Sequence, residues 1–114
     1  MQKYMLLFHE SEDMFRDLSP SEIQEIIAKY TVWRRRLEAD GRFVEGRKLG
    51  AKGKIVRGSS GAIEVTDGPY VEGKEVLGGY FIVRASSFAD AVSIAQASPA
   101  ACNGAVEVRE FDLE

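Results

Sequence analysis

The order of the elements expected along the chain predicts an α+β fold of the ferredoxin-like type, βαβ–βαβ with extra strands in the middle. Two observations support it. Segments 4–8 and 79–83 are continuously apolar and too short for helices, which is typical of buried central strands. Segment 20–40, and another that begins after Ser87, have the apolar spacing and capping residues of helices. We expect one sheet with both helices on one face, and the two apolar strands adjacent and parallel at its centre.

The first helix, 20–40, has clear boundary signals. Ser19 can cap it, Pro20 suits the first helical position, and Glu22 completes a capping box. Gly41 can adopt the left-handed conformation that ends a helix. Apolar residues recur at three- and four-residue spacing, which predicts one inward face: Ile23, Ile26, Ile27, Tyr30, Trp33 and Leu37.

The rest of the chain is expected to form shorter elements. A strand is predicted over 43–49, and segments 54–57 and 62–66 are typical of a hairpin. Segment 67–76 is expected to be a loop. Ser87 and Asp90 predict a capping box for the second helix, and 105–111 alternates as a final strand.

Composition narrows the class of protein. The chain has 114 residues, enough for one domain, and it carries 15 Lys and Arg against 18 Asp and Glu, so its net charge of -3 argues against a general nucleic-acid binder. A single cysteine, Cys102, excludes an intrachain disulfide. No apolar run approaches the ~20 residues that cross a membrane, and the apolar start is interrupted by His9 and Glu10. These features predict a cytoplasmic protein with no membrane contact.

The apolar central strands also predict an oligomer. Two helices cover one face of the sheet, yet both central strands carry large apolar residues on both faces. An open second face would exceed the apolar surface that monomers tolerate, so we expect a homodimer with its sheets face to face. The alternative cover is the hairpin over 54–66, folded back on the sheet.

Few residues suggest chemistry. His9 is the default general base, because a histidine side chain titrates near neutral pH in water, although a polar residue at a strand end is the more common explanation. Cys102 is expected at the same end of the sheet, inert and buried. One histidine and one cysteine are too few for a typical zinc site, so neither a metal nor another cofactor is expected.

The segment before the second central strand is the most informative. Asp67, Tyr70, Lys74 and Glu75 lie in a loop longer than a hairpin needs, which is common at binding sites. A surface turn with weak ion pairs is the alternative. Because the last strand is expected to run antiparallel to the first and return towards this loop, Arg109 is predicted to face the loop's carboxylates or an anionic ligand.

The same segment resembles the YCII-related proteins of the DGPF type. The shared motif comprises Asp67-Gly68-Pro69-Tyr70, then Lys74-Glu75, then Gly78-Gly79-Tyr80, and the likeness extends over nearly the whole chain. The resemblance implies a dimeric α+β barrel and no settled activity. Some relatives act on chlorinated lactones or similar small acids, and a His–Asp pair is implied for YciI-like members.

This chain departs from that pair. The first helix has no histidine, and Tyr30 and Trp33 occupy its inward face. His9 ends the first strand, while Asp67 is expected at the opposite end of the sheet, so no intrachain pair of the two is predicted.

Two functional hypotheses follow. The first is a homodimer that binds a small anionic or carbonyl-containing molecule and acts on it by general acid–base chemistry. Its predicted ligand contacts are Asp67, Tyr70, Lys74, Glu75 and Arg109, and its catalytic candidates are Asp67, Glu75 and His9. The second is a non-catalytic regulatory module associated with a sigma-factor-type transcription system, a partner that the resemblance implies.

Overall fold

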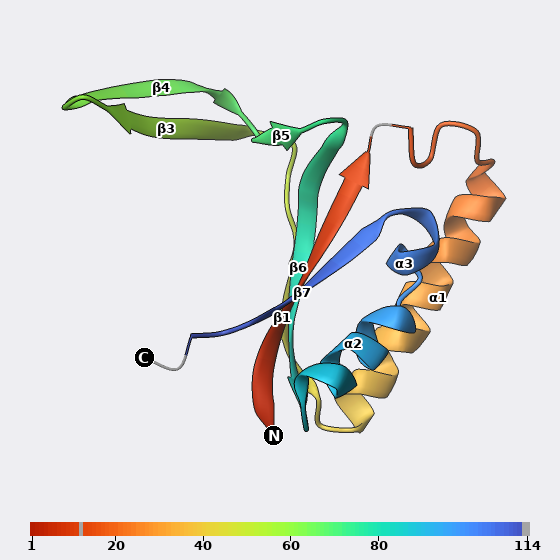
Figure 1. The fold of residues 1–114 in the computed structure, drawn as a ribbon. Coiled ribbons are helices and arrows are strands. Elements are labelled where there is room, and N and C mark those ends of the chain that lie inside the picture. The colour runs from red at the N-terminus through yellow and green to blue at the C-terminus, as the bar shows by residue number, and fades with distance from the viewer. Residues whose placement is uncertain (12, 113–114) are drawn as a thin grey trace.

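The computed structural model describes residues 1–11 and 13–112, as a helix-covered sheet from which a hairpin projects (Figure 1). The main sheet has the strand order β2-β6-β1-β7, with β5 added beside β6, and β3 and β4 form a separate pair. The elements in chain order are β1 (Gln2–Ser11), α1 (Pro20–Ala39), β2 (Phe43–Lys48), β3 (Gly53–Ser59), β4 (Ala62–Gly68), β5 (Val71–Glu72), β6 (Glu75–Ala85), α2 (Phe88–Gln96), α3 (Ala100–Asn103) and β7 (Ala105–Glu110).

Helix α1 begins where the capping signals placed it. The Glu22 backbone N–H donates to Ser19 Oγ at 3.2 Å, and the Ser19 N–H donates to Glu22 Oε1 at 3.1 Å, which completes the capping box. The helix ends at Ala39, and Gly41 has a φ of 69°. The prediction of this helix is confirmed.

Helix α2 is capped by Ser87, whose Oγ accepts from the Asp90 N–H at 3.1 Å. The predicted reciprocal bond shifts by one residue, because Asp90 Oδ2 accepts from the N–H and the hydroxyl of Ser86 and from Arg42 at 2.7 Å. These bonds hold the pKa of Asp90 below its usual value, the Ser86 N–H contributing most. Arg42 thereby ties the start of α2 to the strand that follows α1.

No helix in residues 1–11 and 13–112 is long and apolar enough to span a membrane.

The direction of β6 corrects one expectation. β1 and β6 are central, as predicted, but they are antiparallel, with Leu6 opposite Phe81 and Leu7 opposite Tyr80. β6 is also antiparallel to β2. The helical crossover through α1 therefore makes β1 and β2 parallel, and β6 fills the space between them in the opposite direction.

This direction decides which residues are neighbours. The start of β6 lies beside the end of β1, with Glu75 opposite Ser11. β7 is also antiparallel to β1, so it begins with Ala105 opposite His9 and reaches Arg109 opposite Met5. Arg109 therefore lies towards the end of the sheet away from Glu75, and the prediction that it approaches the 67–75 segment is wrong.

The core lies between the sheet and the helices. Trp33 stacks on Phe81, with ring centroids 5.0 Å apart and an interplanar angle of 7°, and Phe8 meets Phe81 edge to face at 5.3 Å. Trp33 Nε1 also donates to the Ile94 carbonyl at 3.2 Å, which fixes α1 against α2. The buried apolar residues are Tyr4, Leu6, Phe8, Trp33, Leu37, Val83, Ala85, Ala91, Ile94, Ala95 and Ala100.

The opposite face of the sheet, here called the open face, is formed by the alternate residues of the same strands. Met5, Leu7, Tyr80 and Ile82 are half-buried there. The three helices all lie on the other side (Figure 1). The sheet thus has apolar side chains on both faces, as expected, with helices over one of them.

The β3–β4 hairpin, here called the arm, does not fold back over the sheet, so that alternative is wrong. It forms a sheet of its own and extends away from the helices (Figure 1). Ser60 and Gly61 both have positive φ, 51° and 80°, as a two-residue turn of type I′ requires. More than half of the predicted 67–76 loop is strand, because β4 ends at Gly68, β5 spans Val71–Glu72 and β6 begins at Glu75.

Candidate functional site

A cavity of about 520 Å³ lies between α1 and the end of the sheet where β2 and β6 meet. Its walls are largely apolar, and its polar side chains come from β1, α1 and β2. The apolar lining includes Phe8, Phe15, Ile23, Ile26, Ile27 and Phe81, and the charged or hydroxylated lining comprises Glu10, Tyr30, Thr31, Arg34, Arg47 and Lys48. An apolar cavity with a few convergent polar groups is the usual form of a small-molecule site.

A β-bulge makes room for the carboxyl group in this cavity. Phe8 pairs with Gly79 and His9 with Leu77, so Gly78 is the extra residue on β6. A Cβ at Gly78 would lie 2.2 Å from Glu10 Cδ. The Glu10 carboxyl group therefore lies against the β6 backbone, where only glycine leaves space for it.

Two more glycines keep the strands close beside the cavity. A Cβ at Gly79 would lie 2.9 Å from the Arg47 carbonyl oxygen, and one at Gly46 would lie 2.3 Å from Phe81 Cδ1. Gly46 thus accommodates the aromatic ring that stacks on Trp33. The glycines couple the shape of the cavity to the packing of the core.

Tyr30 supplies a phenol to the cavity. Its ring meets Phe8 at 6.2 Å and Trp33 at 6.0 Å, both edge to face, so the core orients it. Burial raises the pKa of Tyr30, a hydrogen bond with the Ser98 side chain lowers it, and the negative charge of Glu10 raises it again. The net effect is a raised pKa, which keeps the phenol protonated and able to donate a hydrogen bond at neutral pH.

The charges that line the cavity favour an anion. Among its described lining residues, Glu10 is the one carboxylate, against the three cations Arg34, Arg47 and Lys48. Arg34 is already engaged, because its Nε donates to Glu38 Oε1 at 3.0 Å and its guanidinium lies 4.5 Å from the Phe43 ring centroid. Lys48, exposed on β2, lies opposite Gly79 beside the bulge, on the face that the helices cover, whereas Arg47 lies opposite Tyr80.

A second groove, of about 720 Å³, lies between α1 and the α2–α3 segment. It contains the Arg42–Asp90 ion pair and the exposed thiol of Cys102. The expected burial of Cys102 is therefore wrong, because α3 turns that residue outwards. Arg42 and Asp90 neutralise each other there, and the part of the groove's lining that the structure describes has no carboxyl group and phenol side by side. We therefore regard the first cavity, which Glu10 and Tyr30 both line, as the candidate site.

His9 lies on the open face and pairs with a residue that the sequence analysis did not single out. Its Nε2 is 2.8 Å from Glu107 Oε1, and Arg109 Nη1 donates to Glu107 Oε2 at 3.3 Å. The hydrogen bond from His9, and then the one from Arg109, hold the pKa of Glu107 below its usual value. Arg109 therefore binds a carboxylate on its own strand, that of Glu107.

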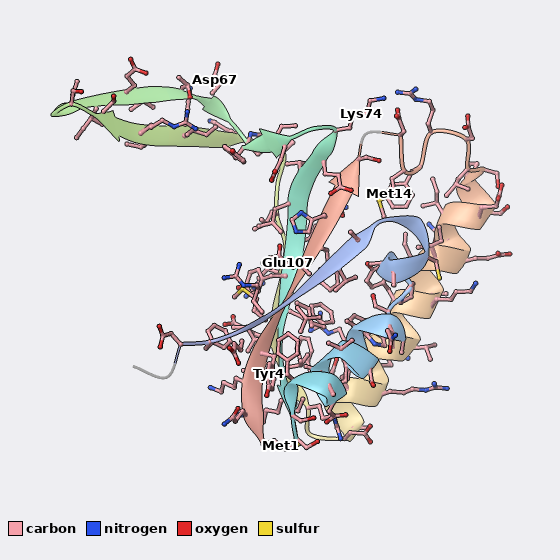
Figure 2. The ribbon with its side chains drawn as sticks, in the orientation of Figure 1. Met1, Tyr4, Met14, Asp67, Lys74 and Glu107 are labelled. Carbon is pink, nitrogen blue, oxygen red and sulfur yellow. The ribbon has the colours of Figure 1, made fainter. Side chains whose placement is uncertain are left out.

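The residues predicted from the 67–75 segment lie elsewhere. Asp67 is on the arm, far from Glu107, and forms an ion pair with Lys54 across the two arm strands (Figure 2). Tyr70 is exposed beyond the arm, and Lys74 and Glu75 are exposed at the turn between β5 and β6.

His9 and Asp67 are engaged with other side chains, rather than lying at opposite ends of the sheet. The 67–75 segment leads into β6 at the same end of the sheet as His9, which the expected parallel arrangement had placed apart. The two side chains have other partners, Glu107 for His9 and Lys54 for Asp67. Within residues 1–11 and 13–112, no three His, Cys, Asp or Glu side chains gather in a group that could hold a metal ion.

Glu10 and Tyr30 were missed as candidate site residues. Alternation along β1 puts Glu10 on the same face as Leu6 and Phe8, so the signal was available in the sequence. Tyr30 was assigned to the inward face of α1, where its hydroxyl could not be distinguished from a purely structural group.

The sheet order and the helices on one face define an α+β protein of the ferredoxin-like class. The YCII-related domain model matches residues 2–112, and the chain belongs to that family. The DGPF subtype stays a prediction. No curated protein matches the sequence.

The fold is similar to that of a solved enzyme. 5-Chloro-2-hydroxyhydroquinone dehydrochlorinase (TftG) from Burkholderia phenoliruptrix AC1100, in complex with 2,5-dihydroxybenzoquinone, superimposes with a TM-score of 0.52. The sequences are 14% identical, and the alignment covers 97% of this chain and 94% of that one. This likeness establishes the fold, and it leaves the activity of this chain to be argued from its own residues.

Proposed function

We propose that the protein binds a small organic anion with a carbonyl or phenolic group in the cavity between α1 and β6, and acts on it by general acid–base chemistry. One observation carries this proposal: the Glu10 carboxyl group, which lies against Gly78, and the half-buried phenol of Tyr30 line the same cavity with apolar walls. Membership of the YCII-related family and the bound quinone of the similar dehydrochlorinase support a small-molecule site.

The proposed roles follow from the chemistry of each group. Glu10 acts as the base and removes a proton from the carbon next to a carbonyl group, becoming protonated itself. The electron pair of the C–H bond forms the C=C bond of an enolate, and Tyr30 stabilises the negative charge on the enolate oxygen by donating a hydrogen bond. Glu10 then returns the proton to the product. Lys48 binds the anionic group of the ligand at the mouth of the cavity.

We also propose that the protein is a homodimer joined through its open face. The half-buried side chains of Met5, Leu7, Tyr80 and Ile82 support a self-complementary apolar interface. The cytoplasmic location expected from the composition stays a prediction.

Thermal-shift measurements test the site with three probes: 2,5-dihydroxybenzoquinone, benzoate and a small lactone. A ligand that binds the native state raises the melting temperature. We expect at least one probe to do so for the wild type, a weaker response for Lys48→Ala, and loss of any turnover in Glu10→Gln and Tyr30→Phe with the fold retained. An unchanged response in all three variants would place the ligand outside the cavity.

The residues predicted from sequence supply the matched comparison. Asp67, Tyr70, Lys74 and Glu75 stay predicted ligand contacts, and Asp67→Asn removes a charge at a position well away from the cavity. If Asp67→Asn weakens probe binding while Lys48→Ala does not, the 67–75 segment holds the ligand. If no small molecule of these classes binds, the regulatory-module hypothesis gains support.

A further inference from the structure

The two faces of the arm differ in character. Residues opposite each other in its register share a face, and side chains alternate between faces along each strand. One face carries Val56 opposite Val65, with Ile63 opposite Gly58 further out and the Lys54–Asp67 ion pair at its base. The other face carries Ile55 opposite Thr66 and Arg57 opposite Glu64. The outer part of the first face is therefore an apolar patch formed by Val56, Ile63 and Val65, here called the apolar face of the arm.

That apolar face lies in solvent in the single chain. Val56, Ile63 and Val65 are 67%, 74% and 62% exposed. A two-stranded hairpin is marginal in stability unless it packs on another element. The radius of gyration is 16.2 Å, against ~13 Å for a compact chain of this length. The arm thus extends from the body of the protein, and its cover must come from outside the chain.

The charge of the arm indicates what kind of surface would cover it. Between Gly53 and Gly68 there are two cations, Lys54 and Arg57, and two anions, Glu64 and Asp67. Each cation lies opposite an anion across the strands. A neutral, internally paired arm gives no electrostatic attraction to nucleic acid or to an anionic membrane surface. Its apolar face suits the surface of a protein.

The direction of the arm indicates which protein. The arm leaves the sheet on the side opposite the helices, which is the side of the open face (Figure 1). The arm and the open face therefore lie on the same side of the sheet, so a second copy that packs on Met5 and Leu7 lies next to the arm.

The size of the open face gives an independent reason. Four strands ~4.8 Å apart with ~3.3 Å rise per residue give it a footprint of ~500 Å². A stable interface covers ~800 Å² on each partner. The apolar face of one arm adds ~200 Å², and in a two-fold dimer each copy both supplies an arm and receives one. With the arms included, the interface reaches the size of a stable one.

We propose that the arm packs its apolar face, Val56, Ile63 and Val65, on a second copy of this chain, so that two copies joined through their open faces are held by reciprocal arms. This inference rests on the homodimer proposed above, and it assigns to the arm a role that the sheet-to-sheet contact does not require.

Sedimentation equilibrium of matched variants tests it. Val65 and Thr66 are adjacent on β4 and lie on opposite faces of the arm, so Val65→Lys and Thr66→Lys add the same charge to the apolar and to the polar face. Because a two-fold dimer carries each substitution twice, we expect Val65→Lys to raise the dimer Kd by about tenfold or more, and Thr66→Lys to change it by less than about twofold. Leu7→Lys, on the open face, should abolish the dimer.

The outcomes separate the two proposals. A wild-type chain that is monomeric at tens of micromolar overturns the homodimer and the arm contact together. A wild-type dimer whose Kd does not respond to Val65→Lys overturns the arm contact alone. Amide hydrogen exchange gives a second readout, because the arm amides should be protected at dimer concentrations and should lose protection on dilution. Equal exchange at both concentrations would also overturn the arm contact.

Discussion

The helix-covered sheet and the arm use similar apolar residues in opposite situations. Val83 on β6 is fully buried beneath the helices, whereas Val65 on β4 is 62% exposed. Both belong to strands with regular antiparallel pairing. The difference shows that a segment can form a regular strand without being buried. The sheet is stabilised by helices of its own chain, whereas the apolar face of the arm can be covered only by another molecule.

The sharpest test of this comparison is a matched pair of truncations. Val83→Ala removes two buried methyl groups and leaves a cavity, so the free energy of unfolding should fall by about 2–3 kcal/mol. Val65→Ala, measured in dilute monomer, should change it by less than about 0.5 kcal/mol. Urea denaturation measures both. Equal losses would mean that the arm is packed within its own chain.

Two glycines test how the core and the cavity differ. Gly46→Ala places a Cβ 2.3 Å from the Phe81 ring, which stacking on Trp33 holds in place, so overpacking should cost about 1–3 kcal/mol. Gly78→Ala places a Cβ 2.2 Å from Glu10 Cδ, the mobile end of a flexible side chain, and should cost less. Gly78→Ala should instead reduce ligand binding in the thermal-shift assay. A larger stability loss for Gly78→Ala than for Gly46→Ala would contradict this assignment.

Glu107, on the open face, should make the free energy of unfolding depend on pH. The hydrogen bond from His9 lowers the pKa of Glu107 in the folded state, so the stability from this group is present above the ordinary carboxyl pKa and is lost as the pH falls below it. The effect should stay below about 1 kcal/mol, because the Glu107 side chain is 41% exposed and solvent screens it. Glu107→Gln should flatten the change in urea midpoint between about pH 5 and pH 3. An unchanged slope in Glu107→Gln would exclude Glu107 as its source.

The smallest expected effect lies at the tip of the arm. Ser60 has a φ of 51°, which asparagine tolerates better than serine in a type I′ turn. Ser60→Asn should stabilise the arm by about 0.5 kcal/mol or less. Hydrogen exchange of the arm amides in dilute monomer is sensitive enough to detect this change, and amides of β1 provide the internal control. Faster exchange in the arm would show that the turn type is misassigned.

Local signals predicted the local structure well. The capping residues Ser19 and Glu22 placed the start of α1, and the apolar segments placed the central strands, because these signals act between residues that are close in sequence. The direction of β6 was not predictable in this way, since an apolar run shows that a strand is buried and says nothing about its neighbour's direction. The misplacement of Arg109 followed from that single error.

The candidate site was predicted least well. The motif residues around Asp67 drew the prediction towards the arm, whereas the cavity depends on Glu10, which becomes informative only once the bulge at Gly78 is known. A bulge is a property of two strands in register, and its position cannot be derived from one strand alone.

The central place of β1 has a consequence for how the chain matures. Gln2 pairs with Ala85, and Tyr4 with Glu110, so both neighbours of this strand are made long after it leaves the ribosome. Until β6 and β7 have been synthesised, the apolar side chains of β1 are uncovered, and helix α1 has no sheet to pack on. Such distant pairing slows folding, and it leaves apolar strand surface exposed while the chain is being made.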